Sequence, residues 1–324
     1  MGNLEGRDLC GRSDRGSGPG ARQHDEVDNV RRAVAEAIRS RVNGPNGAAD
    51  ARRLFDAEGT RWFDESRPVW RVHADASMFV GAMRALLLQS LHPLAMAGVA
   101  EHSDYRNDPW GRLQRTALFL ASVTYGTEAQ ARQACATVRR VHTRVRGVAP
   151  DGRPYDANDP HLLAWVHLAE TDSFLAAYQR FGARPLDRHE QDAYVADAAI
   201  IATELGVLRP PRTVRDLRGQ LAAYHPELRG TPEARAAARY LLRQSPIPLV
   251  ARGPYTVLGA SAVALLPWWA KVMLHIPPLP VTETVMIRPA GKVLVSSMRW
   301  ALTPPASEPA AGVGERSERG RLHT

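Results

Sequence analysis

Helix-starting signals recur throughout the middle of this 324-residue chain. In each, a residue with a short oxygen-bearing side chain precedes an apolar periodic segment, because such a side chain accepts a hydrogen bond from the first helical turn. Asp159-Pro160 opens one segment, which runs to Phe181 and stops at Gly182. Similar start and stop signals predict helices over 75–91, 112–125, 128–146, 187–205, 213–224 and 231–244.

Strand signals are scarce by comparison. Residues 147–155 hold Asp151-Gly152 between two short extended pieces, which is a pattern typical of a small hairpin. The sequence shows no internal repeat. It therefore predicts an all-α fold, with a single domain over residues 28–303 that is long enough to bury a cavity as well as a core.

Both ends differ in composition from this domain. Residues 1–27 are rich in Gly, Arg, Ser and Asp, and residues 304–324 are rich in Pro, Ala, Glu, Gly and Arg, without apolar periodicity. Such segments cannot bury enough surface to offset the entropy of ordering them. We expect two disordered tails.

The formal net charge of +8 would suit a nucleic-acid-binding protein. The arginines, however, are interleaved with acids and apolar residues and are not gathered on one stripe, so we expect no nucleic-acid partner. Two cysteines cannot form a disulfide framework, and we find no signal peptide and no motif for covalent haem attachment. These features favour a cytoplasmic location.

One long apolar stretch covers residues 255–275. Pro267 interrupts it and Lys271 adds a charge, which makes it short for a bilayer span. The pattern favours a pair of buried helices, and a peripheral membrane contact is the alternative.

Several reaction classes lack the spacing that they require. The chain has no Walker loop, no dinucleotide-binding glycine motif, no nucleophile elbow and no zinc-binding cysteine cluster. His189-Glu190 begins like a zinc-protease helix, but Ala193 stands where the second histidine is needed. What remains is a set of polar residues on apolar helix faces.

Arg84 is the first of these residues. The surrounding segment is hydrophobic nearly all round, which predicts a central helix. A buried guanidinium needs a partner, since leaving it unpaired costs several kcal/mol. That partner is either a protein carboxylate, such as Asp104 or Asp108, or the carboxylate of a bound ligand.

A second group follows Asp108. Arg112, Arg115, Thr116 and Phe119 fall on one side of a predicted helix, whose first turn also offers free N–H groups. Two arginines at this place suit a pair of ligand carboxylates. The alternative is that they form surface ion pairs.

The next two helices each carry an inward histidine. His142 shares an apolar stripe with Cys135 and Val138, and His167 shares the face of its helix with Phe174 and Glu170. A lone histidine on an apolar face is more often a hydrogen-bonded core residue than a metal ligand. Two of them on consecutive helices favour a ligand role for one.

These residues together resemble the catalytic domain shared by the MpaB-type oxygenases and the bacterial rubber oxygenases (latex clearing proteins). The resemblance covers residues 70–210 in order and spacing. It rests on five segments: Met83 to Pro93, Gly98 to Ser103, Asp108 to Thr116, Val141 to Gly147, and Asp159 to Tyr178.

The resemblance implies a helical fold that holds one non-covalent haem b. His142 would be the proximal iron ligand, with His167 as the alternative. Arg112 and Thr116 would lie at the haem, and Arg115 takes the place of a basic residue beside that threonine. Arginine stays protonated and cannot ligate iron. Arg112 and Arg84 would bind the haem propionates, and Phe119 belongs to the same face as Arg112.

The implied reaction uses O2 on an apolar small molecule, such as an isoprenoid or another alkene. Glu101 and His102 are the acid–base candidates, although they could equally stabilise the turn in which they lie. The alternative function is a helical protein of the same fold that binds haem or a hydrophobic ligand without turnover.

Overall fold

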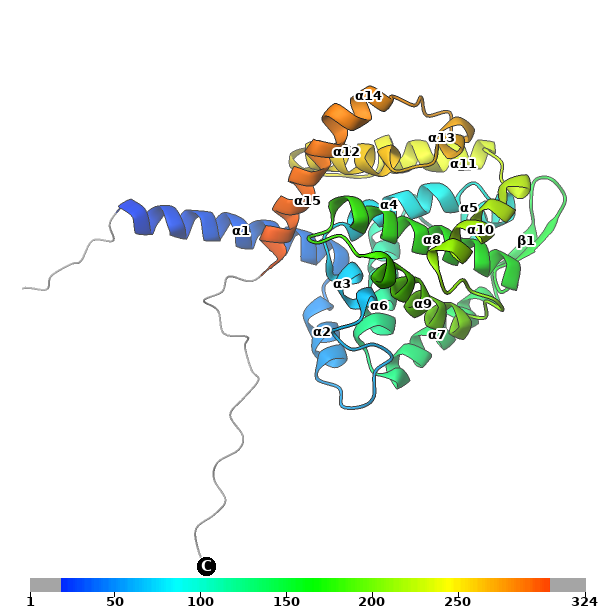
Figure 1. Cartoon of the computed structure of the whole chain (residues 1–324), viewed down its shortest axis with the longest axis horizontal. Coiled ribbons are helices and arrows are strands. Elements are labelled where there is room, and N and C mark those ends of the chain that lie inside the picture. Colours follow the sequence, from blue (N-terminus) through cyan, green and yellow to red (C-terminus); the bar gives the residue numbers. More distant parts are fainter. Residues whose placement is uncertain (1–18, 304–324) are drawn as a thin grey trace, which may run out of the picture.

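The computed structural model describes residues 19–303, with side chains from residue 27 onward. Most of this part of the chain is helical, and its only sheet is one two-stranded antiparallel hairpin (Figure 1). This composition confirms the predicted all-α fold. The N-terminal half contains α1 (Pro19–Asn43), α2 (Gly47–Phe55), α3 (Pro68–Ala74), α4 (Met78–Gln89), α5 (Pro93–His102), α6 (Pro109–Tyr125), α7 (Glu128–His142), β1 (Arg146–Val148) and β2 (Pro154–Asp156).

In the described residues after β2, all the named elements are helical. They are α8 (Pro160–Phe181), α9 (Arg188–Leu205), α10 (Val214–Ala223), the 3₁₀-helix η1 (His225–Glu227), α11 (Pro232–Arg239), the π-helix η2 (Tyr240–Gln244), α12 (Leu249–Ala264), α13 (Trp268–Met273), α14 (Pro280–Thr282), the π-helix η3 (Glu283–Ile287) and α15 (Arg288–Leu302).

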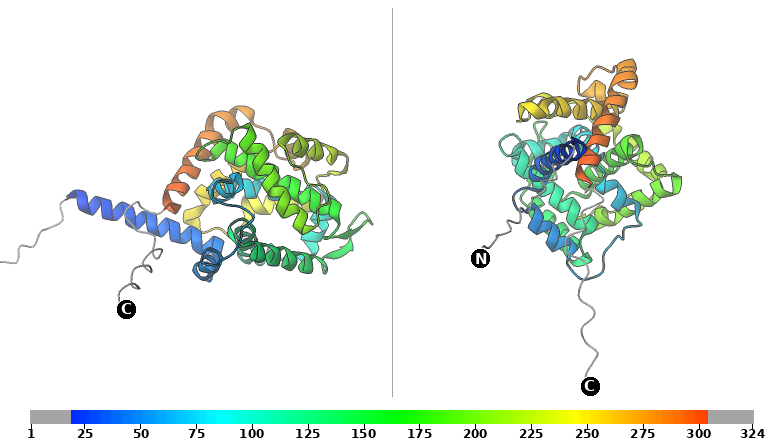
Figure 2. Two further views of the ribbon diagram at one scale, coloured as in Figure 1. Left: turned by 60° about the horizontal axis from the view of Figure 1, so that its bottom comes forward. Right: turned by 90° about the vertical axis from the view of Figure 1, so that its left-hand side faces the viewer.

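The core is built around α4 and α8, which pack closely along their length. Gly81 of α4 makes this approach possible, because a Cβ at that position would lie only 2.7 Å from Cδ1 of Phe174 and 3.1 Å from its Cα. On α8, Trp165 and Leu168 have no exposed surface. α12 covers α4 from the other side, while α3 and α9 pack against α8 (Figures 1 and 2).

The predicted helix signals act as expected at several termini. The Asp159 side chain accepts a hydrogen bond of 2.8 Å from the His161 N–H, and α8 ends before Gly182 as predicted. Asp187 and Glu190 form a reciprocal capping box at the start of α9. Gly206, which follows α9, has a φ of 110°, a conformation that favours glycine.

Three predicted helix boundaries are wrong. α6 begins at Pro109 and not at residue 112, because the Asp108 side chain caps the helix by accepting from the Gly111 N–H. α7 ends at His142 and not near residue 146, because residues 146–148 pair with residues 154–156 as a hairpin. α4 begins only at Met78: the Asp75 carboxylate accepts a hydrogen bond from the Ser77 N–H and pairs with Arg299 of α15. Asp75 therefore joins two distant segments.

The predicted domain boundary at residue 28 falls inside a helix. α1 already begins at Pro19, and it packs against α6 and α15. Arg31 Nε donates to the Trp300 carbonyl (3.0 Å), and Arg39 donates to the Leu302 carbonyl (3.0 Å). Residues 1–18 of the predicted N-terminal tail, and the predicted C-terminal tail over residues 304–324, lie outside the described residues.

The apolar stretch over residues 255–275 forms most of α12 and all of α13. It is only partly buried, since Trp268 is 72% exposed and Val272 is 54% exposed. Lys271 is buried and pairs with Glu283 through contacts of 2.7 and 2.8 Å. Within residues 19–303, no helix combines the length and hydropathy that a membrane crossing needs.

Candidate functional site

Arg112 on α6 is a half-buried cation with little to balance its charge. Its Nη1 donates to Ser103 Oγ (2.5 Å), but in the described part of the chain no carboxylate lies within ion-pair distance of it. Burial lowers the pKa of Arg112, and the neighbouring charge of Arg115 acts in the same direction. A guanidinium in this condition can take an external anion as its counter-charge.

The other candidates on α6 are less enclosed. Arg115 is 70% exposed and pairs with Asp108 at 3.2 Å, which is one of the surface pairs that the sequence left open. The Thr116 hydroxyl is exposed and donates to the Arg112 carbonyl (3.0 Å). Phe119 is half-buried and packs against the main core.

His142 is the last residue of α7, immediately before the hairpin. Its Nδ1 is buried and has no hydrogen-bond partner among the described residues. Burial lowers the pKa of His142, while Asp156 and the backbone at Ala157 act against that change. The ring is therefore neutral at neutral pH, as an iron-ligating imidazole must be.

Glu101 and His102 end α5 beside the same hairpin. Tyr155 of β2 donates its hydroxyl proton to Glu101, and Nε2 of His102 lies 3.1 Å from Tyr155 Oη and 3.2 Å from the Arg146 carbonyl. Both side chains are exposed. They connect α5 to the hairpin, which is the stabilising role that the sequence left open beside the acid–base role.

α8 carries two ionisable groups that burial shifts strongly. Nδ1 of His167 lies 3.3 Å from Thr171 Oγ1, its Nε2 is buried without a partner, and burial lowers the pKa of His167 to about 4. One turn later, burial raises the pKa of Glu170 to about 7. The described residues give Glu170 no counter-charge. Glu170 can therefore exchange a proton near neutral pH.

A third neutral histidine, which sequence reasoning missed, lies on α3. Nδ1 of His73 is 2.8 Å from Thr124 Oγ1 of α6, and burial lowers the pKa of His73 to about 4. Its ring lies 5.6 Å from that of Phe174 and 6.0 Å from that of Tyr194. Burial, and then the charge of Glu170, raise the pKa of Tyr194. The sequence signal that could have revealed it is a histidine within the short apolar segment 68–74.

Arg84 is fully engaged by protein groups. Its Nη2 pairs with Asp172 (2.7 Å), Nη1 donates to Ser173 Oγ (2.7 Å), and Nε donates to the Leu265 carbonyl (3.0 Å). A carboxylate partner was expected, but the proposed acids Asp104 and Asp108 were wrong. With these contacts Arg84 has no need of a ligand carboxylate.

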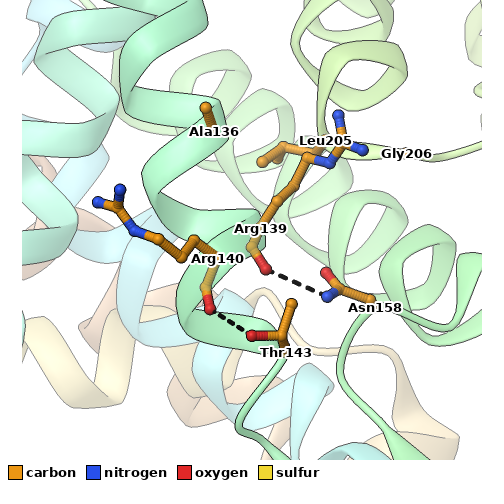
Figure 3. A pocket seen from close by; sticks show the side chains of 7 residues that line it. All are labelled: Ala136, Arg139, Arg140, Thr143, Asn158, Leu205 and Gly206. Carbon is orange, nitrogen blue, oxygen red and sulfur yellow. Dashed lines mark hydrogen bonds between the residues drawn. The ribbon is translucent and has the colours of Figure 1, made fainter.

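An open pocket of about 410 Å³ lies on another face of α7 (Figure 3). None of the candidate residues lines it. Figure 3 shows the Asn158 amide donating to the Arg139 carbonyl and the Thr143 hydroxyl donating to that of Arg140. The residues that line the pocket are Ala136, Arg139, Arg140, Thr143, Asn158, Leu205 and Gly206. This pocket is separate from the candidate site.

The helical fold agrees with the comparisons with known proteins. The family model described as "ER-bound oxygenase mpaB/B'/Rubber oxygenase, catalytic domain" matches residues 70–301, which is more than half of the chain. The chain belongs to this family of oxygenases, and oxygenases are oxidoreductases.

A solved structure has the same fold. It is titled "Structure of Latex Clearing Protein LCP in the closed state", and it is 21% identical to this chain. The match covers 88% of this chain and 85% of that one, with a TM-score of 0.51. No curated protein matches this chain.

Burial of Glu170 gives a prediction that does not depend on any ligand. Its folded pKa of about 7 lies above the ordinary value of 4.5, so the folded state holds a proton that the unfolded state has lost. The buried carboxyl therefore lowers the free energy of unfolding. This destabilisation is absent below pH 4.5, grows as the pH rises, and is fully developed above pH 7. Glu170→Gln is expected to stabilise the protein by about 3 kcal/mol at pH 8 and to change little at pH 4.5.

Denaturant unfolding at the two pH values checks this prediction. Glu233→Gln is the comparison variant, because Glu233 lies in the first turn of α11 and its side chain makes no ion pair among the described residues. Equal effects of Glu170→Gln at pH 4.5 and pH 8 would mean that Glu170 is not held protonated.

Proposed function

We propose that the protein is a haem b-dependent oxygenase that uses O2 to oxidise an apolar small molecule, such as an alkene or an isoprenoid. Family membership supports oxygenase chemistry on an apolar substrate. The single observation that carries the haem proposal is the half-buried Arg112 without a carboxylate partner among the described residues, because haem supplies two carboxylates at one edge.

The residues present fit this cofactor. A haem site needs a neutral imidazole, a cation for the propionates and apolar helix faces. His142 has a buried nitrogen without a hydrogen-bond partner and a lowered pKa, so it would hold the iron. Arg112 would hold a propionate, while Phe119 and the neighbouring Thr116 would line the cofactor side of α6.

The bound haem would supply the iron at which O2 is activated. The protein keeps His142 neutral by burial, since protonation would remove the lone pair that ligates iron. Arg115 adds a second positive charge beside Arg112 but would not ligate iron, because its guanidinium stays protonated. His167, enclosed on α8, remains the alternative ligand.

Two sets of residues are proposed to move protons. Glu101, with the phenol of Tyr155 donating to it and His102 beside that phenol, lies at the corner formed by α5 and the hairpin. Glu170 lies inside the helical layer, and its pKa of about 7 suits a proton acceptor at neutral pH. The substrate contacts one set or the other.

An oxygen electrode separates the proposed enzyme from a binding protein. Haem-loaded protein is expected to consume O2 when an isoprenoid or an unsaturated lipid is added, and haem-free protein is not. Glu101→Gln, His102→Ala and Glu170→Gln each identify a proton acceptor if uptake falls. Ligand retention without any O2 uptake would contradict the enzyme and support a binder of the same fold.

Arg112→Ala tests the propionate site. It is expected to weaken haem binding by about 10- to 100-fold, which corresponds to the loss of one charge-assisted hydrogen bond. The haem-free variant should be at least as stable as the wild type, because the substitution removes a buried charge that has no carboxylate partner among the described residues. Titration with haem measures the affinity, and thermal unfolding measures the stability.

Arg115→Ala is the matched control, since Arg115 lies one turn along α6 and is 70% exposed. Its haem affinity should stay within about twofold of that of the wild type. Unchanged affinity in Arg112→Ala would contradict the propionate assignment.

A further inference from the structure

Two histidines and one glutamate meet at a corner away from α6 and α7. His92 precedes α5, His161 lies in the first turn of α8, and Glu227 ends η1. Nε2 of His161 lies 3.0 and 2.9 Å from the two carboxylate oxygens of Glu227, and Nε2 of His92 lies 3.4 Å from one of them. One ligand atom from each residue lies within 4.8 Å of the others.

His92 has no hydrogen-bond partner that explains its burial. Its side chain is 1% exposed, Nδ1 has no partner among the described residues, and Nε2 has the Glu227 oxygen at 3.4 Å, which is an ion-pair contact and not a hydrogen bond. The rings around it are those of His161, Trp165 and Tyr224, each 6.2 Å away. Buried polar atoms without partners are rare in folded proteins, because each costs free energy. Nε2 of His92 faces Glu227 and His161 and points to a shared ligand.

Tyr224 contacts His161 at two points. The Tyr224 hydroxyl donates to the His161 carbonyl (2.8 Å), and its oxygen lies 3.2 Å from Nδ1 of the same histidine, where it can accept the proton of the Nδ1–H tautomer. The two rings stack with centroids 4.6 Å apart. A neutral His161 with its proton on Nδ1 presents the lone pair of Nε2 to the Glu227 carboxylate. Two electron-rich atoms 2.9 Å apart need a cation between them.

We propose that His92, His161 and Glu227 bind one divalent transition-metal ion, for which Zn²⁺ is the best match. Two imidazole nitrogens and one carboxylate oxygen are a common set of three protein ligands for zinc. With bonds of 2.0–2.1 Å in a tetrahedral site, ligand atoms lie about 3.3 Å apart. The distances of 2.9–3.4 Å between the carboxylate and the imidazoles are close to this value.

The contact between His161 and Tyr224 is of the kind that supports a metal-bound histidine. A metal-bound histidine usually donates its second ring N–H to an acceptor, which fixes the ring and its tautomer. Tyr224 is 6% exposed, so it holds this position firmly. The metal would join the starts of α5 and α8 to η1, three segments far apart in the sequence. It shares no residue with the proposed haem site.

Zinc titration of haem-free, tag-free full chain tests the site. After treatment with a chelator, wild-type protein should bind one Zn²⁺ per chain in competition with a chromophoric chelator. His161→Asn and Glu227→Gln should each weaken binding by more than about 100-fold, and Tyr224→Phe by about 10-fold. Zn²⁺ at about 1,000 times its Kd should raise the Tm of the wild type by roughly 5–10 °C.

His225→Asn is the matched control. His225 belongs to the same η1 helix as Glu227, is exposed, and lies beside Trp269 rather than in the cluster. Its zinc affinity should equal that of the wild type. Because the His161 side chain is 53% exposed, His161→Asn should fold even if another variant does not. Lack of saturable Zn²⁺ binding by the wild type, or unchanged affinity in His161→Asn, would overturn the proposal and leave a proton as the shared cation.

Discussion

Replacing His142 by alanine is expected to abolish haem retention. The proposed iron bond goes through this imidazole, which burial keeps neutral and which has a buried nitrogen without a hydrogen-bond partner among the described residues. Loss of the ligating side chain should lower haem affinity by at least about 100-fold, since even the residues that support a metal ligand contribute 10- to 100-fold. Protein purified from haem-supplemented cells should then lack a Soret band.

His167→Ala provides the comparison for this experiment. His167 is also a neutral histidine with an unpartnered nitrogen, but it lies on α8 beside Thr171 and not at the hairpin corner. This variant is expected to keep its Soret band. The opposite outcome, with the band lost in His167→Ala and kept in His142→Ala, would move the iron to His167.

Of the substitutions proposed for this protein, Arg84→Ala is expected to cause the largest loss in the free energy of unfolding. Arg84 is 3% exposed, and its removal leaves the Asp172 carboxylate and Ser173 without their partner at the contact between α4 and α8. Breaking a buried pair by removing one member costs about 3–5 kcal/mol. Because the Asp172 side chain is 23% exposed, we expect the lower end, about 3 kcal/mol, measured by denaturant unfolding.

A double variant separates charge from packing. Arg84→Met combined with Asp172→Leu removes both charges and keeps most of the volume, so it should recover much of the stability lost in Arg84→Ala. Haem content per folded molecule should stay as in the wild type. A large drop in haem content in well-folded Arg84→Met/Asp172→Leu protein would show that Arg84 does bind a propionate.

Local signals explain why much of the fold could be predicted. The limits of α8 follow from Asp159, Pro160 and Gly182, because capping depends on residues that are neighbours in the sequence. The end of α7 could not be predicted in the same way. Helical periodicity continues past His142, and only the pairing of residues 146–148 with 154–156 ends the helix there. Strand pairing depends on contacts between separate segments, so the local sequence of α7 does not reveal where the helix ends.

The site was predictable only in part, for the same reason. The neutral, inward character of His142 follows from the stripe on its own helix, whereas the partner of Arg84 is Asp172, which another helix supplies. The raised pKa of Glu170 depends on burial by other helices. The cluster of His92 and Glu227 joins residues far apart in the chain, and no spacing pattern reveals it.

Isotope labelling tests the central claim most directly. Haem-loaded protein is incubated with an isoprenoid or an unsaturated lipid under ¹⁸O₂, and the products are analysed by mass spectrometry. An oxygenase transfers oxygen atoms from O2 to its substrate, so the account predicts labelled product with wild-type protein and none with His142→Ala. Oxygen consumption without label in any product, or equal labelling with His142→Ala, would contradict it.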